Sequence, residues 1–204
     1  MTDNEQTDPR KNPQARRRLI VGISGASGAI YGVRALQLLR DADIETHLVV
    51  SKAAEMTLAY ETDLKLKDLR ALASVVHATA DVGASISSGS FQTMGMLVVP
   101  CSVKTMSEIA SGVTGTLLAR AADVVLKDRR RLVLAVRETP LHAGHLRNMA
   151  LLADIGAVIA PIVPAFYNRP QTIDDIVDHT VGRLLDLFGI ETGAVRRWQG
   201  APGK

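Results

Sequence analysis

The sequence predicts an α/β fold in which helices cover both faces of a parallel sheet. Two observations support this prediction. Strand-like apolar segments alternate along the chain with segments that have the apolar spacing of helices. The strand-like segments are apolar throughout, so both of their faces are expected to be buried. The chain has 204 residues, 47% of them hydrophobic, which is enough for one such core, and we expect a single domain from residue 19 to residue 204.

The expected elements follow one another in a regular order. Runs of apolar residues predict strands at residues 19–23, 46–50, 95–100, 132–136 and 157–162. Apolar residues three or four positions apart predict helices at residues 29–40, 52–60, 104–109, 116–126, 145–153 and 172–188. Thr172 is the expected N-cap of the last helix, because Asp174 and Asp175 follow it in the first turn.

The run GISGASGA, residues 22–29, joins the first strand to the first helix. Its glycines permit a tight turn and the close approach of a ligand, and Ser27 places a hydroxyl beside the unpaired N–H groups of the helix start. Such a turn can hold a phosphate. The run lacks the GxGxxG spacing and the lysine of a P-loop, so a flavin or another nucleotide is expected in place of NAD or ATP.

Composition limits the class of protein. The first 18 residues are polar, contain two prolines and are expected to form a disordered basic tail. They hold five of the 24 Lys and Arg and three of the 21 Asp and Glu, so the rest carries 19 positive and 18 negative side chains. This near-neutral body argues against a nucleic-acid partner. No apolar run has the length of a membrane span, and the single cysteine, Cys101, fits a reducing cytoplasm.

Five segments together resemble the flavin prenyltransferases of the UbiX group. They are GISGASGAIYG, SKAAEMTLAYET, SISSGSFQTMGMLVVPCSVKTMSEIASG, LLARAADVVLKDRRRLVLAVRETPLHAGHLRNM and PAFYNRPQTIDDIVDHTVGRLLDLFGI. The resemblance implies a flavodoxin-like Rossmann subunit that assembles into a dodecamer with sites shared between subunits. It also implies a transferase that joins a dimethylallyl group from dimethylallyl monophosphate, or in some members the diphosphate, to N5 and C6 of reduced FMN. The prenylated FMN serves a UbiD-type decarboxylase.

The resemblance also assigns roles to particular residues. Those expected to bind FMN are Gly25, Ala26, Ser27, Ser51, Ser102, Thr105 and Arg120. Those expected to bind the substrate phosphate are Lys127, Arg137, Tyr167 and Arg183, with Arg137 reaching the site of a neighbouring subunit. Glu138 is the expected acid and base, and Ser27, Glu61 and Lys127 complete the catalytic set. No metal is expected.

Each of these residues also has a plain structural interpretation. A lone Arg or Lys most often forms a surface salt bridge, Glu61 would be a solvated helix end, and Ser27 would cap a helix. Trp198 is either part of a C-terminal lid or an anchor for the last helix. The SSGS element, residues 87–90, is expected to contribute from an adjacent subunit, although the preceding DVGASI lacks the tryptophan that some members carry.

Three further residues are given lesser roles. His142 and His145 have the H-x-x-H spacing of metal ligands but no evident third ligand. Cys101 follows a buried strand and is expected to be a small buried thiol.

Two alternative functions stay open. An FMN-dependent cysteine decarboxylase would have a P-x-M-N element where this chain has Pro100-Cys101-Ser102-Val103. A non-catalytic flavin-carrying subunit would be expected to have lost the ionisation residues, which this chain retains.

Overall fold

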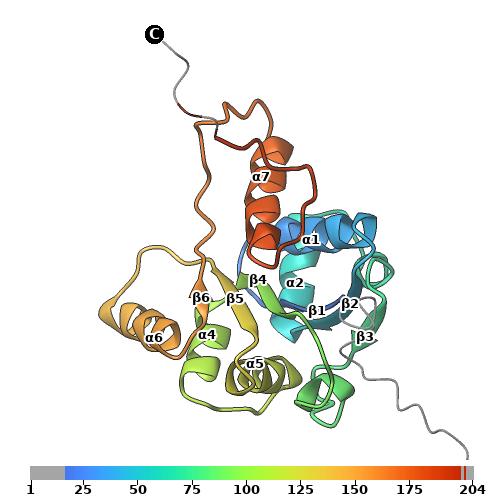
Figure 1. Cartoon of the computed structure of the whole chain (residues 1–204), viewed down its shortest axis with the longest axis vertical. Coiled ribbons are helices and arrows are strands. Elements are labelled where there is room, and N and C mark those ends of the chain that lie inside the picture. The colour runs from blue at the N-terminus through green and yellow to red at the C-terminus, as the bar shows by residue number, and fades with distance from the viewer. Residues whose placement is uncertain (1–16, 199, 201–204) are drawn as a thin grey trace, which may run out of the picture.

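The protein, a computed structural model described here over residues 17–198 and 200, is built around a parallel sheet (Figure 1). The sheet has six strands in the order β3-β2-β1-β4-β5-β6. The strands are β1 (Arg18–Ile23), β2 (Glu45–Val50), β3 (Val75–His77), β4 (Gly95–Cys101), β5 (Arg131–Val136) and β6 (Val158–Ile159). The helices are α1 (Ala29–Asp41), α2 (Lys52–Glu61), α3 (Leu66–Arg70), α4 (Val103–Ala110), α5 (Leu117–Lys127), α6 (Ala143–Asp154) and α7 (Ile173–Asp186), with a short 3-10 turn at Ser85–Ser87.

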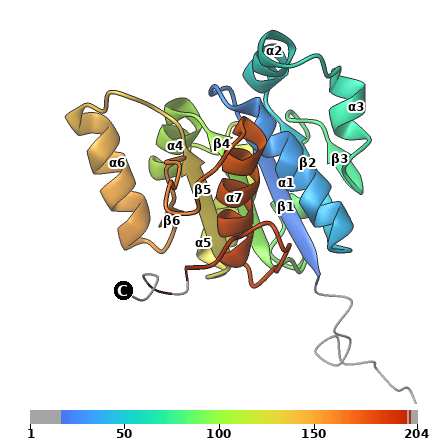
Figure 2. The same cartoon turned by 90° about the horizontal axis from the view of Figure 1, so that it is seen from above.

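Helices cover both faces of the sheet, as the sequence predicts. Helices α1 and α7 pack on one face, and α4, α5 and α6 lie on the other (Figures 1 and 2). Successive strand residues point to opposite faces, so Leu19 and Val21 join the core under α1, and Ile20 joins the core under α5. Two apolar cores therefore hold the sheet between them, and the α/β prediction is confirmed.

The strand order locates the ligand edge. With the short β3 included, the order is that of the dinucleotide-binding Rossmann fold; without it, the five remaining strands have the order 2-1-3-4-5 of flavodoxin. In both descriptions the order reverses between β1 and β4. Ligands of such sheets bind beyond the carboxyl ends of the strands at this reversal, so the segments after β1 and β4 are the place to look for a site.

Three parts of the structure differ from the sequence prediction. Helix α3 and strand β3 were not predicted, because both are short and the strand exposes Val75 and Val76. Strand β6 is shorter than the predicted 157–162, although Ile162 still donates a backbone hydrogen bond to Val136. Arg18, predicted to belong to the tail, opens β1 and donates to the Glu45 carboxylate at 2.9 Å. Arg17, also predicted to belong to the tail, accepts a backbone hydrogen bond from Glu45, and residues 1–16 lie outside the described residues.

Among the residues that the structure describes, every helix is too short or too polar to cross a bilayer.

We expect the ion pair between Arg34 on α1 and Asp178 on α7 to hold these two helices together. The contact is bidentate, with Nη2 donating to Oδ2 at 2.9 Å, and both side chains are about two-thirds buried. Arg34→Ala should lower the free energy of unfolding by about 1–3 kcal/mol. Urea titration checks this. Adding Asp178→Ala to Arg34→Ala should lower the free energy of unfolding little further. The control is Arg40→Ala, at an exposed position on the same helix, which should change stability by less than about 0.5 kcal/mol.

Candidate functional site

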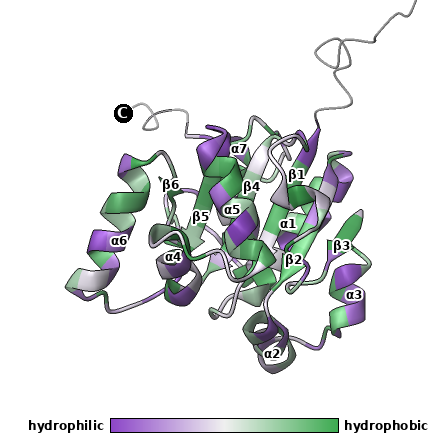
Figure 3. Cartoon of the chain, turned by 90° about the horizontal axis from the view of Figure 1, so that it is seen from below, coloured by the Kyte–Doolittle hydropathy of each residue, from purple (hydrophilic) through white to green (hydrophobic). Residues whose placement is uncertain are grey.

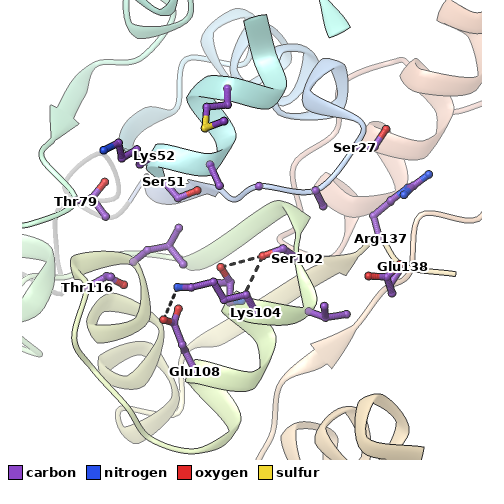
Figure 4. Close-up of a pocket in the computed structure, with 17 residues that line it drawn as sticks. Ser27, Ser51, Lys52, Thr79, Ser102, Lys104, Glu108, Thr116, Arg137 and Glu138 are labelled. Atoms are coloured by element: carbon purple, nitrogen blue, oxygen red, sulfur yellow. Dashed lines mark hydrogen bonds and ion pairs between the residues drawn. The ribbon is translucent and has the colours of Figure 1, made fainter. Parts of the chain in front are cut away.

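A cavity of about 700 Å³ opens at the carboxyl ends of β1, β2, β4 and β5 (Figure 4). This lies within the range of roughly 300–1,000 Å³ that ligand pockets commonly have. Its lining includes eight of the residues singled out in the sequence, namely Gly25, Ala26, Ser27, Ser51, Ser102, Thr105, Arg137 and Glu138. In Figure 4, Ser27, Arg137 and Glu138 gather on one side, and Lys52, Thr79 and Thr116 gather on the other. The cavity therefore has two chemically different ends.

The turn after β1 needs its glycines. Gly28 has a φ of 101°, a left-handed conformation that side chains rarely adopt. A Cβ at Gly25 would lie 2.3 Å from the Cβ of Ala53 at the start of α2. The chain can pass this close to α2 only with glycine there, and the approach shapes the wall of the cavity.

The side chain of Glu61 lies at the N-terminus of α1 and binds its free N–H groups. Its Oε2 accepts hydrogen bonds from the N–H groups of Gly28 at 2.8 Å and Ala29 at 2.9 Å. Desolvation alone would raise the pKa of Glu61, but hydrogen bonds from Ser27, Ala29 and Gly28 and the charge of Arg137 lower it below its usual value. The carboxylate thus takes the N–H groups that the sequence analysis assigned to a phosphate. Glu61 is not a free solvated helix end, and Ser27 bonds to Glu61 instead of capping α1.

Helix α4 begins at the cavity through a buried network of hydroxyl groups. Ser102 is the N-cap of α4, and its hydroxyl accepts from the N–H of Thr105 at 3.3 Å. The N–H of Ser102 donates to the Ser24 hydroxyl at 2.7 Å, and that hydroxyl donates to the Pro100 carbonyl at 3.1 Å. Ser24 therefore ties the ends of β1 and β4 together at the reversal of strand order.

Helix α2 begins beside α4 in the same manner. Ser51 is its N-cap and accepts from the N–H of Ala54 at 3.1 Å. The first N–H groups of α2 and α4 have no partner within their helices, and both starts line the cavity. Unlike the start of α1, these two helix starts stay open to an anion.

The cavity also has lining residues that the sequence analysis missed. They include Lys52, Thr79, Lys104, Glu108 and Thr116. Lys104 pairs with Glu108 at 2.6 Å and lies over the cavity (Figure 4). Lys52 directly follows the cap Ser51, and Lys104 comes two residues after the cap Ser102, which was a usable signal. Thr79 follows β3 and donates to the Val50 carbonyl at 2.6 Å. Because β3 was not predicted, Thr79 was not predicted to lie at this edge of the sheet.

Arg137 and Glu138 follow β5 and line the cavity of their own chain. The expectation that Arg137 reaches the site of a neighbouring subunit stays a prediction. Within its own chain, the N–H of Arg137 bonds to the Cys101 carbonyl at 3.0 Å, which holds residue 137 beside the end of β4. Glu138 Oε1 accepts from the N–H of Thr139 at 2.9 Å. A cation and a carboxyl group thus stand side by side near Ser27 (Figure 4).

Two residues of α5 lie outside this cavity. Arg120 pairs with Asp123 at 2.8 Å, one turn further along. Lys127 ends the helix, about 14 Å along its axis from the cavity-lining Leu118, and pairs with Asp128 at 2.8 Å. A Cβ on Gly89 of the SSGS element would lie 2.9 Å from Lys127 Nζ, so this element and Lys127 form one patch.

Tyr167 and Arg183 also lie apart from the cavity, on or beside α7. The Tyr167 hydroxyl is 3.1 Å from His179 Nε2, and its ring meets the exposed Trp198 edge-on with 5.8 Å between centroids. Arg183 pairs with Asp186 at 2.8 Å. The four expected phosphate ligands therefore occupy three places in one chain and do not form a single pocket there.

Other candidates have structural roles. His142 is the N-cap of α6, with Nδ1 accepting from Gly144 and His145. Within the described part of the chain, no three His, Cys, Asp or Glu side chains lie close enough together to hold a metal ion. Cys101 is fully buried, and burial raises the pKa of its thiol to about 12, which confirms the expected inert thiol.

Comparison with known proteins agrees with this geometry. Residues 7–185 match the Flavoprotein family. The chain is 64% identical to the flavin prenyltransferase UbiX of Escherichia coli K12 over 188 residues, which cover 91% of this chain and all of that protein. The chain belongs to the flavin prenyltransferase family.

Solved structures of this family have the same fold. AnUbiX (PadA1), in complex with FMN and dimethylallyl pyrophosphate, matches at a TM-score of 0.90 and 53% identity, covering 92% of this chain and all of that one. A dodecameric FMN-dependent UbiX-like decarboxylase from E. coli O157:H7 matches at a TM-score of 0.88 and 53% identity. The match covers 90% of this chain and all of that one. The flavodoxin-like Rossmann prediction and the flavin prenyltransferase prediction are confirmed.

The alternative of a cysteine decarboxylase is not supported. The cysteine decarboxylase TvaF is 17% identical, with a TM-score of 0.57 over 70% of this chain and 88% of its own, which shows a shared fold alone.

The cavity fits the flavin that this family binds. Two open helix starts with serine caps suit a phosphate, and Gly25 leaves room that a side chain would fill. The hydroxyl groups of Ser51, Ser102 and Thr105 in the lining suit the ribityl chain of the flavin. FMN is therefore compatible with the residues present.

Gly25→Ala should weaken FMN binding by more than about tenfold, because the added methyl group forces α2 away from the turn and moves one of the two helix starts. Titrating the protein into FMN and recording the flavin fluorescence measures the affinity. Gly115→Ala is the control, since a Cβ there meets nothing within 4 Å. Equal FMN affinity in both variants would show that the close contact with Ala53 does not shape the site.

Glu61→Gln should change the pH dependence of stability. The folded protein lowers the pKa of Glu61, so its carboxylate contributes stability that is complete above the unfolded pKa and is lost as the pH falls through the folded pKa. The difference in unfolding free energy between wild type and variant should be constant above about pH 5.5 and shrink below about pH 4. Urea titrations from pH 3 to 7 measure it.

Proposed function

We propose that this protein transfers a dimethylallyl group from dimethylallyl monophosphate to reduced FMN, releasing phosphate. The single observation that carries the proposal is the cavity itself. It combines two open helix starts with the side chains of Ser27, Arg137 and Glu138. Anion-binding N–H groups and an acid–base pair in one cavity are what a flavin nucleotide and an allylic phosphate require together.

The chain's residues divide between holding the flavin and moving protons. Ser51, Ser102 and Thr105, with the first N–H groups of α2 and α4, would hold the flavin phosphate and ribityl chain. Lys52 and Lys104 add positive charge near these two helix starts. Reduced FMN supplies N5 and C6, the two atoms to which the dimethylallyl group is joined. Ser27, at the other end and bonded to Glu61, is placed to guide a proton near the ring.

Glu138 is the acid–base residue in this proposal. Breaking the bond between the allylic carbon and the phosphate oxygen leaves negative charge on the phosphate, which Arg137 stabilises and Glu138 protonates. The proton released from N5 passes to the remaining double bond of the attached prenyl group, C6 bonds to the carbon that becomes positive, and the Glu138 carboxylate accepts the proton that leaves C6. Both side chains line the same part of the cavity, so no large movement is needed between the two proton transfers.

Neighbouring copies of the chain would complete the site. Lys127, Tyr167 and Arg183 lie away from the cavity in one chain, and we propose that each reaches the cavity of another subunit. Helix α6 stands at the edge of the molecule and carries hydrophobic residues (Figure 3). Leu146 is 53% exposed, and Leu151 and Ile155 are close to half exposed. These residues suit burial against another copy, and one relative is a dodecamer.

The proposal also covers the recipient of the product, the location of the protein and the choice of donor. The product would pass to a UbiD-type decarboxylase, and the protein would work in the cytoplasm. We keep the monophosphate as the expected donor, as the family resemblance implies. The relative AnUbiX was solved with the pyrophosphate, so both donors belong in the test.

The decisive experiment incubates the protein anaerobically with reduced FMN and each donor, followed by mass measurement of the extracted flavin. A mass increase of one C5H8 unit supports the proposal, and unmodified FMN with both donors contradicts it. Glu138→Gln should bind FMN as the wild type does but slow transfer by about 100- to 10,000-fold. Turnover at the wild-type rate in that variant would remove Glu138 from the mechanism.

Mixing variants tests the sharing of sites between subunits. Glu138→Gln and Arg183→Ala should each be impaired, yet a mixed oligomer should regain activity at about a quarter of its sites, where an intact cavity meets an intact Arg183. Glu138→Gln mixed with Arg137→Ala is the control, because both residues line the cavity of one chain and no site is then complete. Subunit exchange is verified by native mass spectrometry. Recovery in the control mixture alone would contradict this arrangement.

A further inference from the structure

His179 is a buried histidine that the proposed site does not yet use. It lies in the middle of α7 and is 3% exposed. Its Nε2 is 3.1 Å from the Tyr167 hydroxyl oxygen, and the two rings meet edge-on with 5.5 Å between centroids. Its Nδ1 is buried and has no hydrogen-bond partner among the described residues.

The environment keeps His179 neutral. Burial lowers its pKa below the usual value, and the charge of Arg183 lowers it further, while Asp186 acts in the opposite direction. The charged side chains that line the adjoining polar cavity are Arg169, Asp175, Asp178 and Arg196. A neutral imidazole carries one N–H group, which sits on either Nδ1 or Nε2.

The unpartnered Nδ1 decides between these two forms. A proton on Nδ1 would leave a buried N–H group without an acceptor, which is costly and rare in folded proteins. A proton on Nε2 leaves only a lone pair unpaired and lets Nε2–H donate to the Tyr167 oxygen. The hydrogen of the Tyr167 hydroxyl is then free for another acceptor.

The surroundings of Tyr167 place that hydrogen near a cation. Its ring lies between His179 and Trp198, which limit its rotation, and about half of its surface is exposed. Arg183 is four residues after His179 on α7, so it lies on the same side of the helix one turn away. The residue that holds the Tyr167 hydroxyl and the guanidinium group of Arg183 are thus one helical turn apart on α7.

We propose that His179 is a positioning residue: it donates Nε2–H to Tyr167 and thereby presents the Tyr167 hydroxyl hydrogen to the phosphate of the allylic substrate. This inference rests on the proposed function, in which Tyr167 and Arg183 bind that phosphate. Each hydrogen bond in the chain from His179 through Tyr167 to phosphate polarises the next, so the pair binds an anion better than a lone tyrosine.

The kinetic test compares His179→Leu with His179→Gln. Leucine removes the donor and should raise the KM for dimethylallyl monophosphate by about five- to tenfold, with little change in kcat and in FMN affinity. Glutamine supplies an amide N–H group and should restore most of the loss. Val177→Ala, at a similarly buried position of α7, is the control that lowers the melting temperature without raising KM. An unchanged KM in His179→Leu would overturn the proposal.

A double-mutant cycle then tests whether His179 acts through Tyr167. Tyr167→Phe should raise KM by itself, and adding His179→Leu to it should have no further effect. Fully additive effects would show that His179 has a separate role and would overturn the proposal.

Nitrogen-15 NMR tests the hydrogen bond without any activity. The ring signals of His179 are identified by their loss in His179→Leu. The proposal expects the proton on Nε2 and a lone pair on Nδ1. A proton on Nδ1 would overturn the assignment. If the wild type prenylates FMN with neither donor, the proposed function fails, and this measurement still decides the hydrogen bond.

Discussion

The carboxylate of Glu61 ties the last residue of α2 to the first turn of α1, and the geometry of the cavity depends on this contact. Gly28, in its left-handed conformation, is the N-cap of α1 and has no side chain to satisfy the N–H groups there. Glu61 reaches across from α2 and accepts two of them. A carboxylate in this position excludes a phosphate from the start of α1. The proposed function therefore assigns the flavin phosphate to the starts of α2 and α4, and Ser27 to the flavin ring.

The core of the fold was predictable because it depends on burial. The strands β1, β2, β4 and β5 and most helices have a clear apolar pattern, and the prediction placed them within one or two residues. Strand β3 was missed because Val75 and Val76 are exposed at the edge of the sheet and three residues give no periodicity. In β4, Pro100 has no N–H group, and the pairing with β5 shifts between Val98 and Cys101. A shift of that kind is invisible in an apolar run.

The site was predictable where chain geometry alone brings residues together. Ser27, Ser51, Ser102 and Glu138 all follow strands of one parallel sheet, so they share an edge. The contact of Glu61 spans 33 residues and joins a helix end to a helix start, which no local pattern reveals. Lys127, Tyr167 and Arg183 could be named from the family resemblance but could not be placed. In the proposed function, their positions in the site depend on how copies of the chain pack, which is not encoded in the order of strands and helices.

In the proposed mechanism this separation has a chemical purpose. One chain alone provides the groups that hold the flavin and move protons, but Lys127, Tyr167 and Arg183 face solvent or neighbouring surface. An allylic cation formed in an open cavity would react with water. If the remaining phosphate ligands arrive only with another subunit, the charge that promotes ionisation is complete only where the subunit interface also excludes water. Tyr167, held by His179 inside its own chain, then enters that interface with its hydroxyl already oriented, so less conformational freedom is lost when the substrate phosphate binds.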